Sequence, residues 1–588
     1  MSDETRPFSS SPRRPAEMDP EELRQLDEDC PIVCVGHLEG TYVFLSPSGE
    51  RRIMTARELT QNGIASIFDG DAKWLTARFT RYNRDGQVTG FLHDAAARWL
   101  MRRCAAAGHF DPATPARGVG VWPRRSLGAA DPAVIVHAGD ALWMDGAWGS
   151  PGVFVDGAIY AARPRIGRPD MDGPAPEETG RQVLAYLRNW SFRVPGCEAL
   201  LLGLIGTSAL GAAAPWRPSR AMTGPRGCGK TELMAFIGSV LGDQANAMQD
   251  LSEAGFRQAI ASEARTVLID EAEGGDDGSG GAVQGVVELI RKMAGGAGGK
   301  VVRGGQDGRA RHTEIVGSVL MAAVLGVDLK PQDRSRITEI ELLPPAPMAE
   351  ETLRQRLAEL EFAKEWAGQY SAALRARCIK GHGRFIRDWK LYRRLLISSG
   401  CDARQADQYA ALIAGRDLLL FDESLDEAAA SRSLEPLMPI VLEAMSVDQP
   451  EGEGKLCLNH LLTPPAENWS GGQRQTLSIL VMSGFKAAVA DRHVLGAYGL
   501  RVDNSGRDKP ALIVAYHHNG LERVFAGTRW ARGKWVKALK SLAMVEPDKR
   551  PWRFAGIQER ALRVPKAYLP FDDESDSGAG SGEGVGGG

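Results

Sequence analysis

The sequence lacks several features that would assign it to a protein class at once. Its eight cysteines form no CxxC pair, and no apolar run reaches the roughly 20 residues that span a bilayer. Neither charge sign is in excess, since 71 Lys and Arg face 74 Asp and Glu, for a formal net charge of −3. These absences argue against a disulfide-stapled secreted module, a four-cysteine zinc module, a membrane-embedded protein and a chain that coats nucleic acid along its whole length.

The first residues also lack the apolar segment of a signal peptide, so we expect a cytoplasmic protein with reduced thiols and no membrane contact. Residues 1–28 are rich in Ser, Pro and charge, and residues 571–588 consist mainly of Gly, Ser and acids. Such compositions bury too little apolar surface to offset the entropy of ordering. Both ends are therefore predicted to be disordered tails.

A chain of 588 residues exceeds the span of one hydrophobic core, and its composition divides it into four predicted regions. Strand-like runs around one good helix predict an N-terminal α+β domain at residues 29–165. A helical pair followed by alternating strands and helices predicts an α/β core at residues 177–345. Residues 346–448 have the pattern of a helical, lid-like domain. Residues 455–570 have that of a winged-helix-like domain with a strand pair and a basic, aromatic helix.

The most specific motif is GPRGCGKT at residues 224–231, which has the spacing GxxxxGK[ST] of a P-loop. Its flanks fit as well. A short strand is predicted at residues 219–223, and apolar residues at helical spacing predict a helix over residues 232–241. A strand, a glycine loop and a helix thus follow in the order that a phosphate-binding loop requires.

Each residue type in this motif has a chemical reason. Gly224, Gly227 and Gly229 allow backbone N–H groups to approach phosphate oxygens, and the N-terminus of the following helix attracts the same anion. Lys230 is expected to reach the β- and γ-phosphates of ATP, and Thr231 to hold Mg²⁺. The core is therefore predicted to be a P-loop NTPase.

A second motif, RTVLIDE at residues 265–271, is an apolar β-type run that ends in two acids. Asp270 is predicted to complete the Mg²⁺ shell, and Glu271 to orient or deprotonate the attacking water. Alone, the run also fits a buried strand that ends in a solvated turn. Its combination with the P-loop favours the catalytic interpretation.

The segment that follows is rich in glycine and in basic residues. A helix is predicted at residues 282–294, then a hairpin, then a strand at about residues 314–327. A basic hairpin can grip a phosphate backbone, and a solvated turn is the alternative. The candidate DNA-binding residues of the hairpin are Lys300, Arg303, Arg309 and Arg311.

Two arginines, Arg334 and Arg336, stand just before the predicted last strand of the core. An arginine in this place can project to the γ-phosphate of a neighbouring subunit and stabilise charge in the transition state. An ion pair at the surface is the alternative for either of them.

Near the C-terminus, bases and indoles alternate on the predicted basic helix. Arg529, Arg532 and Lys534 are candidates for a second DNA contact. Trp530 and Trp535 fit either a stacking platform for bases or a buried core.

The phrases WRPSRAMTGPRGCGKT, VLIDEAEG, KVVRGGQDGRA and GVDLKPQDRSRITEIEL follow one another in this order. Together they resemble the ATPase core of phage and prophage primase-helicases, in the superfamily 3-like branch of AAA+ proteins, over residues 215–345. The resemblance implies a ring, often hexameric, that hydrolyses ATP between subunits and pulls one DNA strand past a hairpin. That family usually senses the γ-phosphate with an Asn, Ser or Thr near the end of the following strand. The corresponding segment here, MAAVLGVDL, contains no Asn, Ser or Thr, so this role is not assigned.

These observations predict an ATP-dependent DNA helicase or translocase for phage or mobile-element replication, with ATP and Mg²⁺ as cofactors. The expected partners are single-stranded or forked DNA and further copies of the chain in a ring. An ATP-dependent switch that binds DNA or assembles on it without processive unwinding is the alternative. Primase chemistry is indicated only by the isolated pair Asp69 and Asp71, so a primase or loader is expected to be a separate polypeptide.

Overall fold

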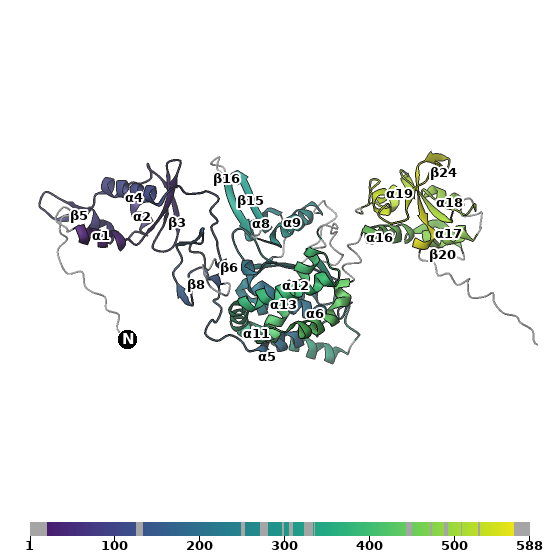
Figure 1. The fold of residues 1–588 in the computed structure, drawn as a ribbon, viewed down its shortest axis with the longest axis horizontal. Coiled ribbons are helices and arrows are strands. Elements are labelled where there is room, and N and C mark those ends of the chain that lie inside the picture. Colours follow the sequence, from purple (N-terminus) through teal and green to yellow (C-terminus); the bar gives the residue numbers. More distant parts are fainter. Residues whose placement is uncertain are drawn as a thin grey trace, which may run out of the picture. The chain divides into compact units, whose positions relative to one another are not determined.

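The computed structural model divides the chain into two compact units, Met1–Ile440 and Val441–Gly588 (Figure 1). It describes residues 20–124, 133–248, 253–270, 280–296, 299–304, 310–322, 333, 336–347, 349–442, 450–470, 473–486, 492–506, 509–526, 528 and 530–569. Among these residues no helix has the length and apolar character needed to cross a bilayer, and all eight cysteines are free thiols.

The first unit begins with an antiparallel sheet that carries helices on one face. Its elements are α1 (Pro20–Glu28), β1 (Val33–Leu38), β2 (Thr41–Leu45), β3 (Arg51–Thr55), α2 (Gln61–Ile67), α3 (Lys73–Arg78), β4 (Thr80–Tyr82), β5 (Val88–Phe91) and α4 (His93–Ala107). Ala96, Leu100 and Cys104 recur at helical spacing on α4, so one face of this helix is buried against Phe44 of β2.

Helix α1 corrects the predicted N-terminal tail, which extended to residue 28. The indole of Trp74 donates to the carbonyl of Leu26 at 2.8 Å, and Arg78 pairs with Asp27 at 2.7 Å. These contacts hold residues 20–28 on the domain, and of the charged residues that suggested a tail, Glu21, Arg24 and Glu28 are exposed on the helix. Residues 1–19 and the predicted tail at 571–588 lie outside the described residues.

A second group of short strands follows, within the predicted α+β domain. Its members are β6 (Gly120–Arg124), β7 (Ala133–His137), β8 (Leu142–Met144), β9 (Ala147–Gly149), β10 (Val153–Val155) and β11 (Ala158–Tyr160). Trp122 and Tyr160 form a cluster with Ala264 and Val316, which belong to the α/β core. This part of the chain therefore packs on the core and forms a small extension of it.

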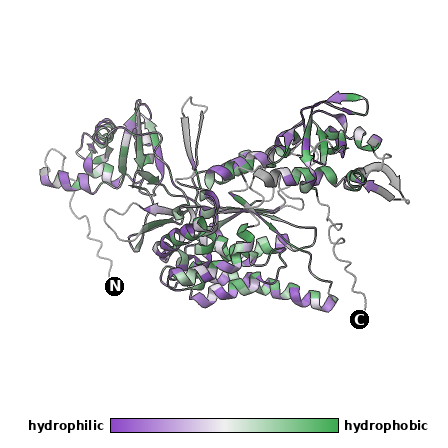
Figure 2. Cartoon of the chain, turned by 45° about the vertical axis from the view of Figure 1, so that its right-hand side comes forward, coloured by the Kyte–Doolittle hydropathy of each residue, from purple (hydrophilic) through white to green (hydrophobic). Residues whose placement is uncertain are grey.

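The α/β core contains a five-stranded, all-parallel sheet, as the alternating pattern predicted. In spatial order its strands are β13 (Ala245–Met248), β14 (Thr266–Ile269), β17 (Val319–Ala322), β12 (Ser219–Thr223) and β18 (Ile337–Glu341). One face packs on α8 (Glu253–Ala259) and α9 (Gly280–Met293), and α7 (Lys230–Leu241) follows β12 directly. Hydrophobic residues gather in these strands and on the inner helix faces, drawn green in Figure 2.

The single strand predicted over residues 314–327 is wrong. Glu314 closes β16 (Ala310–Ile315), which pairs with β15 (Gly299–Gly304) as a hairpin, and β17 begins only at Val319. Gly317 separates the two with a φ of 141°, a conformation that favours glycine. The apolar run therefore contains a chain reversal that its hydrophobicity hides.

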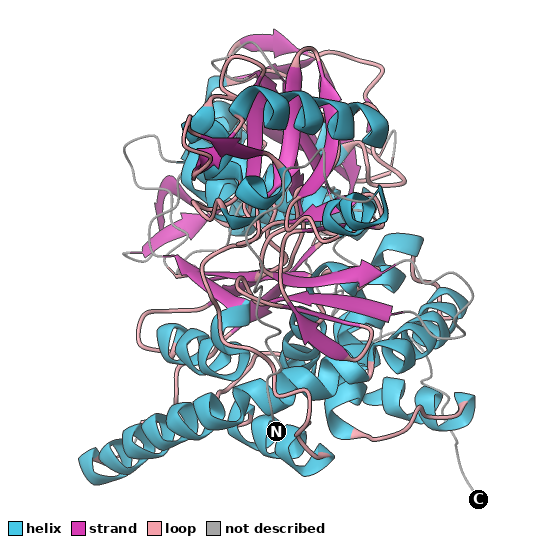
Figure 3. Cartoon of the chain, turned by 90° about the vertical axis from the view of Figure 1, so that its left-hand side faces the viewer, coloured by secondary structure: helices cyan, strands magenta, loops and turns pink. Residues whose placement is uncertain are grey.

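Helices form a further layer of the first unit, seen below the core sheet in Figure 3. They are α5 (Glu177–Leu187), α6 (Cys197–Ala209), α11 (Glu350–Lys380), α12 (His382–Ser398), α13 (Ala403–Leu420) and α14 (Glu427–Leu434). Helices α6 and α13 pack at backbone distance, since a Cβ on Gly203 would lie 1.8 Å from the carbonyl oxygen of Leu412. The glycines of α6 thus allow the close approach of the two helices.

The second unit has its own core around an antiparallel sheet in the order β21–β22–β26–β23. Its elements are α16 (Pro450–Leu462), β19 (Pro465–Ser470), β20 (Gln473–Thr476), α17 (Leu477–Phe485), α18 (Arg492–Ala497), β21 (Leu500–Asp503), β22 (Ala511–Ala515), α19 (Asn519–Val524), α20 (Trp535–Leu539), β23 (Glu546–Pro547), β24 (Trp552–Phe554), β25 (Ile557–Glu559) and β26 (Ala561–Pro565). The strand pair β21–β22 confirms the predicted hairpin. Phe525 and Trp535 stack at 5.3 Å between ring centres inside this core.

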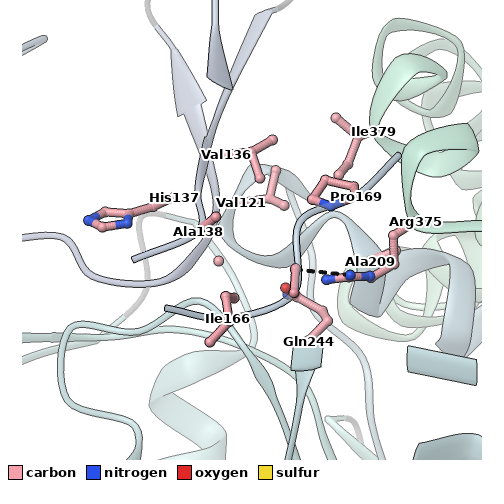
Figure 4. A pocket seen from close by; sticks show the side chains of 12 residues that line it. Val121, Val136, His137, Ala138, Ile166, Pro169, Ala209, Gln244, Arg375 and Ile379 are labelled. Carbon is pink, nitrogen blue, oxygen red and sulfur yellow. Dashed lines mark hydrogen bonds between the residues drawn. The ribbon is translucent and has the colours of Figure 1, made fainter. Parts of the chain in front are cut away.

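A small cavity of about 10 Å³ lies where the extension meets the core, between β6, β7, α6 and α11 (Figure 4). This volume is close to the minimum that holds one water molecule. Arg375 borders it and donates to the carbonyl of Gly167 at 3.0 Å.

His137, at the end of β7, is fully buried beside this cavity. Its Nε2 lies 2.8 Å from the carbonyl oxygen of Ala161, and its Nδ1 accepts from the N–H of Gly139 at 3.0 Å. The accepting Nδ1 defines a neutral ring with its proton on Nε2. Burial lowers the pKa of His137 from 6.5 to about 4.

We expect this histidine to make the first unit less stable as the pH falls from 6.5 to about 4. In that pH range His137 is protonated in the unfolded chain but stays neutral in the folded one. The free energy of unfolding therefore falls, by on the order of 3 kcal/mol. Urea unfolding at pH 7.5 and pH 4.5 should show a smaller pH dependence for His137→Phe than for the unsubstituted chain. His109→Phe, at an exposed position, should keep the full dependence. Equal pH dependence in all three proteins would contradict this assignment.

Candidate nucleotide-binding site

The P-loop sequence forms the predicted strand, loop and helix. Strand β12 ends at Thr223, and α7 begins at Lys230. Between them Gly224, Gly227 and Gly229 have φ angles of 149°, 79° and 87°, which residues with a Cβ rarely adopt. The three glycines are thus required by the backbone path of the loop itself.

Two of these glycines also lie against other groups. A Cβ on Gly224 would lie 2.5 Å from the carbonyl oxygen of Leu342, and one on Gly229 would lie 2.9 Å from Nε1 of Trp190. A Cβ on Gly227 would meet no atom within 4 Å. The loop is therefore fixed at both ends and open in the middle.

Lys230 points back into the loop. Its ammonium donates to the carbonyl oxygens of Gly224 at 2.7 Å and Pro225 at 3.2 Å. Thr231 is exposed in the first turn of α7, and the N-terminal N–H groups of α7 are available for an anion. A lysine ammonium inside a glycine-rich loop, at the N-terminus of a helix, can bind a phosphate group.

Asp270 follows β14 directly and is half-buried at the carboxyl edge of the sheet. Its N–H donates to the carbonyl oxygen of Met248, the last residue of β13, at 3.2 Å. Since all five strands are parallel, Asp270 and the P-loop share the same edge, separated by the end of β17. Glu271 lies outside the described residues, as does most of the segment in which no γ-phosphate sensor was assigned.

The strand order also marks this edge as a binding position. From β12 the chain crosses to β13 at one side of the sheet, and after β17 it crosses β12 to form β18 on the other side. Loops that leave neighbouring strands in opposite directions open a crevice at the carboxyl edge, where ligands bind in α/β sheets. The P-loop occupies this switch point.

Arg336 lies at the opposite, amino edge of the sheet. It precedes Ile337, which pairs with Ser219 at the start of β12. The P-loop leaves the other end of β12, so Arg336 does not face the P-loop of its own chain. Burial first, and then the nearby Arg404 and Arg291, lower the pKa of Arg336. Arg334 lies outside the described residues.

The predicted basic hairpin is present as β15 and β16 in an antiparallel register that pairs Lys300 with Glu314 and Arg303 with Arg311. It projects beyond the core sheet in Figure 1. Its turn, with Arg309, lies outside the described residues. At its base the chain is ordered, since Ser262 donates from its N–H to the carbonyl oxygen of Glu314 at 2.9 Å.

The Glu314 side chain joins this base to the extension. It is 9% exposed and pairs with Arg117 at 3.3 Å. Arg117 also donates to the hydroxyl of Tyr160 at 2.9 Å and lies 4.9 Å above the ring of Trp122. A buried carboxylate that is paired in this way holds its strand firmly, because breaking the pair leaves an uncompensated charge.

The basic, aromatic helix predicted near the C-terminus needs correction. Residues 530–534 form turns, and only the five residues of α20 are helical. Arg532 has a φ of 59°, and Lys534 occupies the N-cap position of α20 without a side-chain hydrogen bond to the helix. Trp535 is fully buried and donates from Nε1 to the carbonyl oxygen of Ala515, so it is a core residue and offers no stacking platform. Arg529 lies outside the described residues.

Trp190 was not found by sequence analysis. Its Nε1 donates to the carbonyl oxygen of Gly229 at 3.0 Å, and its ring lies beside Phe236 of α7. It follows α5 and is 39 residues away from the loop it supports, so no local pattern marks it. A second unpredicted contact joins Glu232 of α7 to Lys364 of α11 at 3.0 Å.

The isolated pair Asp69 and Asp71 belongs to a turn. Asp69 accepts from the N–H of Ser48 at 2.6 Å, and Asp71 accepts from that of Lys73 at 2.9 Å. Among the residues that the structure describes, no group of three or more His, Cys, Asp or Glu side chains is placed to bind a metal ion.

No protein-family model matches this sequence, and no curated protein matches it either. Among solved structures, the chain aligns with one described as SCCmec type IV Cch, an active helicase, at 11% identity over 90% of this chain and 92% of that chain, with a TM-score of 0.47. It aligns with the C-terminal region of NrS-1 at 9% identity over 92% and 98% of the two chains, with a TM-score of 0.34. At such identities and scores, only the geometry of this chain supports an interpretation of the site.

Two matched substitutions test the geometry of the loop. Gly227→Ala and Gly229→Ala both place a Cβ in a left-handed conformation, at a cost of about 1–2 kcal/mol. Only Gly229→Ala also drives that Cβ against Trp190. In chemical denaturation without nucleotide, Gly229→Ala should therefore lower the free energy of unfolding by about 1–3 kcal/mol more than Gly227→Ala does. Equal losses would mean that Trp190 does not support the loop.

Proposed function

We propose that this chain is an ATP-dependent DNA helicase or translocase that serves the replication of a phage or another mobile element. The observation that supports this most is the P-loop with Lys230 inside it, at the switch point of a parallel sheet. The resemblance of four sequence motifs to primase-helicase cores is the reason to propose DNA as the substrate of this ATPase.

In this proposal the loop N–H groups and Lys230 bind the β- and γ-phosphates of ATP. Lys230 would exchange the carbonyl oxygens of Gly224 and Pro225 for phosphate oxygens, so its charge is already placed before binding. Thr231 and Asp270 would hold Mg²⁺, which binds to few protein oxygens and to substrate phosphates. When bound, the ion neutralises charge on the phosphates. Glu271 is the proposed base for the attacking water.

Arg336 has no access to this site within its own chain, because it stands at the other edge of the sheet. We therefore assign it to the γ-phosphate of a neighbouring copy in a ring. Arg336 is half-buried, and in this proposal its guanidinium would stabilise transition-state charge on that phosphate. Within its own chain, Arg336 lies near Asp333, which pairs with Arg291 at 3.1 Å.

The hairpin β15–β16 is the proposed contact with one DNA strand, through Lys300, Arg303, Arg309 and Arg311. Its base is held by the Arg117–Glu314 pair, and its two described strands project beyond the core sheet (Figure 1). A firm base allows movement of the core to be transmitted to a bound strand. Arg532 and Lys534 in the second unit remain proposed DNA contacts.

We expect Lys230→Ala to abolish ATP hydrolysis and the separation of a forked duplex, because the phosphates lose their cation. Glu271→Gln should bind ATP and hydrolyse it slowly, since the Mg²⁺ ligands are unchanged while water activation is lost. Lys73→Ala, at a side chain that is 93% exposed, is the matched control and should keep both activities. The measurements are DNA-stimulated phosphate release and strand separation with hydrolysable and non-hydrolysable nucleotide.

Unwinding by the Lys230→Ala variant at the rate of the control would refute the assignment. DNA binding that needs ATP, without strand separation at any nucleotide, would support the switch in place of the helicase.

A further inference from the structure

Three of the eight cysteines lie in the N-terminal α+β domain. Cys30 follows α1, Cys34 lies on β1, and Cys104 lies in the last turn of α4. All three belong to the hydrophobic cluster of this domain or pack against it. They do not form a group that could hold a metal ion, and none of them is a candidate ligand for nucleotide or DNA. The domain thus contains a set of thiols to which no role is assigned.

Two of these thiols contact each other directly. The S–H group of Cys34 donates a hydrogen bond to the sulfur of Cys104. The S–H group of Cys104 in turn donates to the carbonyl oxygen of Val43 on β2 at 3.9 Å. A strand and a helix that are far apart in the sequence therefore place two sulfur atoms side by side.

Backbone contacts at the end of α4 explain why the two cysteines meet. The N–H of His37 donates to the carbonyl oxygen of Gly108 at 3.1 Å, and the N–H of Phe110 donates to that of His37 at 2.9 Å. A Cβ on Gly36 would lie 2.9 Å from the same carbonyl oxygen of Gly108, so this close approach requires glycine. Strand β1 is thus attached to the chain one helical turn beyond Cys104.

The hydrogen bond between the thiols also sets their acidity. It stabilises a thiolate at Cys104, and so it lowers the pKa of Cys104 and raises that of Cys34. Burial raises the pKa of Cys30 to about 12. The thiolate is the reactive form of cysteine, and the pair can lose one proton while the other stays between the two sulfurs. The pair is therefore the reactive part of this set, and Cys30 is not.

The two members of the pair differ in their access to solvent. Strand β1 is an edge strand in the sheet order β1–β2–β3, and Cys34 is half-buried there. Cys104 is fully buried behind it. A small oxidant can reach Cys34 from the edge of the sheet, and the second thiol already stands next to the sulfur that would be oxidised.

We propose that Cys34 and Cys104 are a modification site at which a hydroperoxide generates an intramolecular disulfide. The Cys34 sulfur attacks the peroxide, so that an S–O bond forms, the O–O bond breaks, and the leaving oxygen takes up the Cys34 proton. The Cys104 sulfur then displaces hydroxide from the Cys34 sulfenic acid, and the Cys104 proton converts this hydroxide into water. The two thiols lose two electrons, and one peroxide gains them.

The disulfide would join β1 to α4 and close the chain between residues 34 and 104. It needs a sulfur–sulfur distance of about 2.0 Å, and the two sulfurs are already in contact. A crosslink that closes a long segment restricts the unfolded chain strongly, so the oxidised domain should be the more stable form. The pair shares no residue with the candidate nucleotide site, so this inference does not depend on the proposed function.

Mass spectrometry of the full chain after treatment with hydrogen peroxide tests the bond. The chain should lose two of its eight thiols, counted with N-ethylmaleimide after unfolding, and a digest should contain a peptide pair joined through Cys34 and Cys104. Dithiothreitol should restore both thiols. Cys30→Ala is the matched control and should form the same bond. A link between Cys30 and Cys34, or oxidation without this link, would overturn the proposal.

Dimedone, which captures sulfenic acids, identifies the thiol that reacts first. In Cys30→Ala/Cys104→Ala no neighbouring thiol remains, so peroxide should leave a sulfenic acid on Cys34 that dimedone labels. In Cys30→Ala the label should be at least about tenfold weaker, because Cys104 forms the disulfide first. Equal labelling in the two proteins, or no label on Cys34 in the double variant, would contradict the proposed reaction.

Hydrogen exchange measures the effect on the domain without any substitution. Peroxide should slow the exchange of amides in β1 and α4 by at least about tenfold, and dithiothreitol should reverse this change. Cys34→Ala, treated in the same way, should show no slowing. Equal slowing in Cys34→Ala, or none in the unsubstituted chain, would show that no bond joins these two elements.

Discussion

The ammonium group of Lys230 is the charge around which the candidate nucleotide site is built. It sits in a loop that three glycines bend through left-handed conformations, and the carbonyl oxygens of Gly224 and Pro225 hold it there. A loop of this shape is strained for any other residue type. Its surroundings compensate, since Trp190 donates to one end of the loop and the backbone of Leu342 lies against the other.

The parallel sheet places the candidate phosphate and metal ligands at one edge and the candidate arginine at the other. The P-loop and Asp270 stand where strands end, while Arg336 stands where a strand begins. In a parallel sheet these edges are a strand length apart and face away from each other. Arg336 and the P-loop of one chain can therefore not meet within that chain, and the proposed ring would bring them together between two copies.

The hairpin depends on the same sheet from a different direction. Residues 261–265 lead into β14 and contact both the base of the hairpin, at Glu314, and the extension, at residues 118–120. Strand β14 carries Asp270 at its far end. One strand thus spans the distance between the proposed metal ligand and the buried Arg117–Glu314 pair. It therefore connects the carboxyl edge of the sheet to the base of the hairpin.

How much of this could be read from the sequence depends on the range of the interactions. The P-loop, the strand before Asp270 and the hairpin were predictable because each is encoded by neighbours, through glycine spacing or an apolar run. The strand expected over residues 314–327 failed because one conformation, at Gly317, reverses a run of uniform hydrophobicity. Trp190 and Arg404 could not be found, since the residues they act on, Gly229 and Arg336, are 39 and 68 residues away along the chain. Arg404 lies near Arg336 because α13 crosses the start of β12, where Gln408 of α13 donates to the carbonyl oxygen of Ser219. The position of α13 depends in turn on its close packing with α6, at Gly203 and Gly415. Site residues defined by helix packing therefore become visible only once the fold is known.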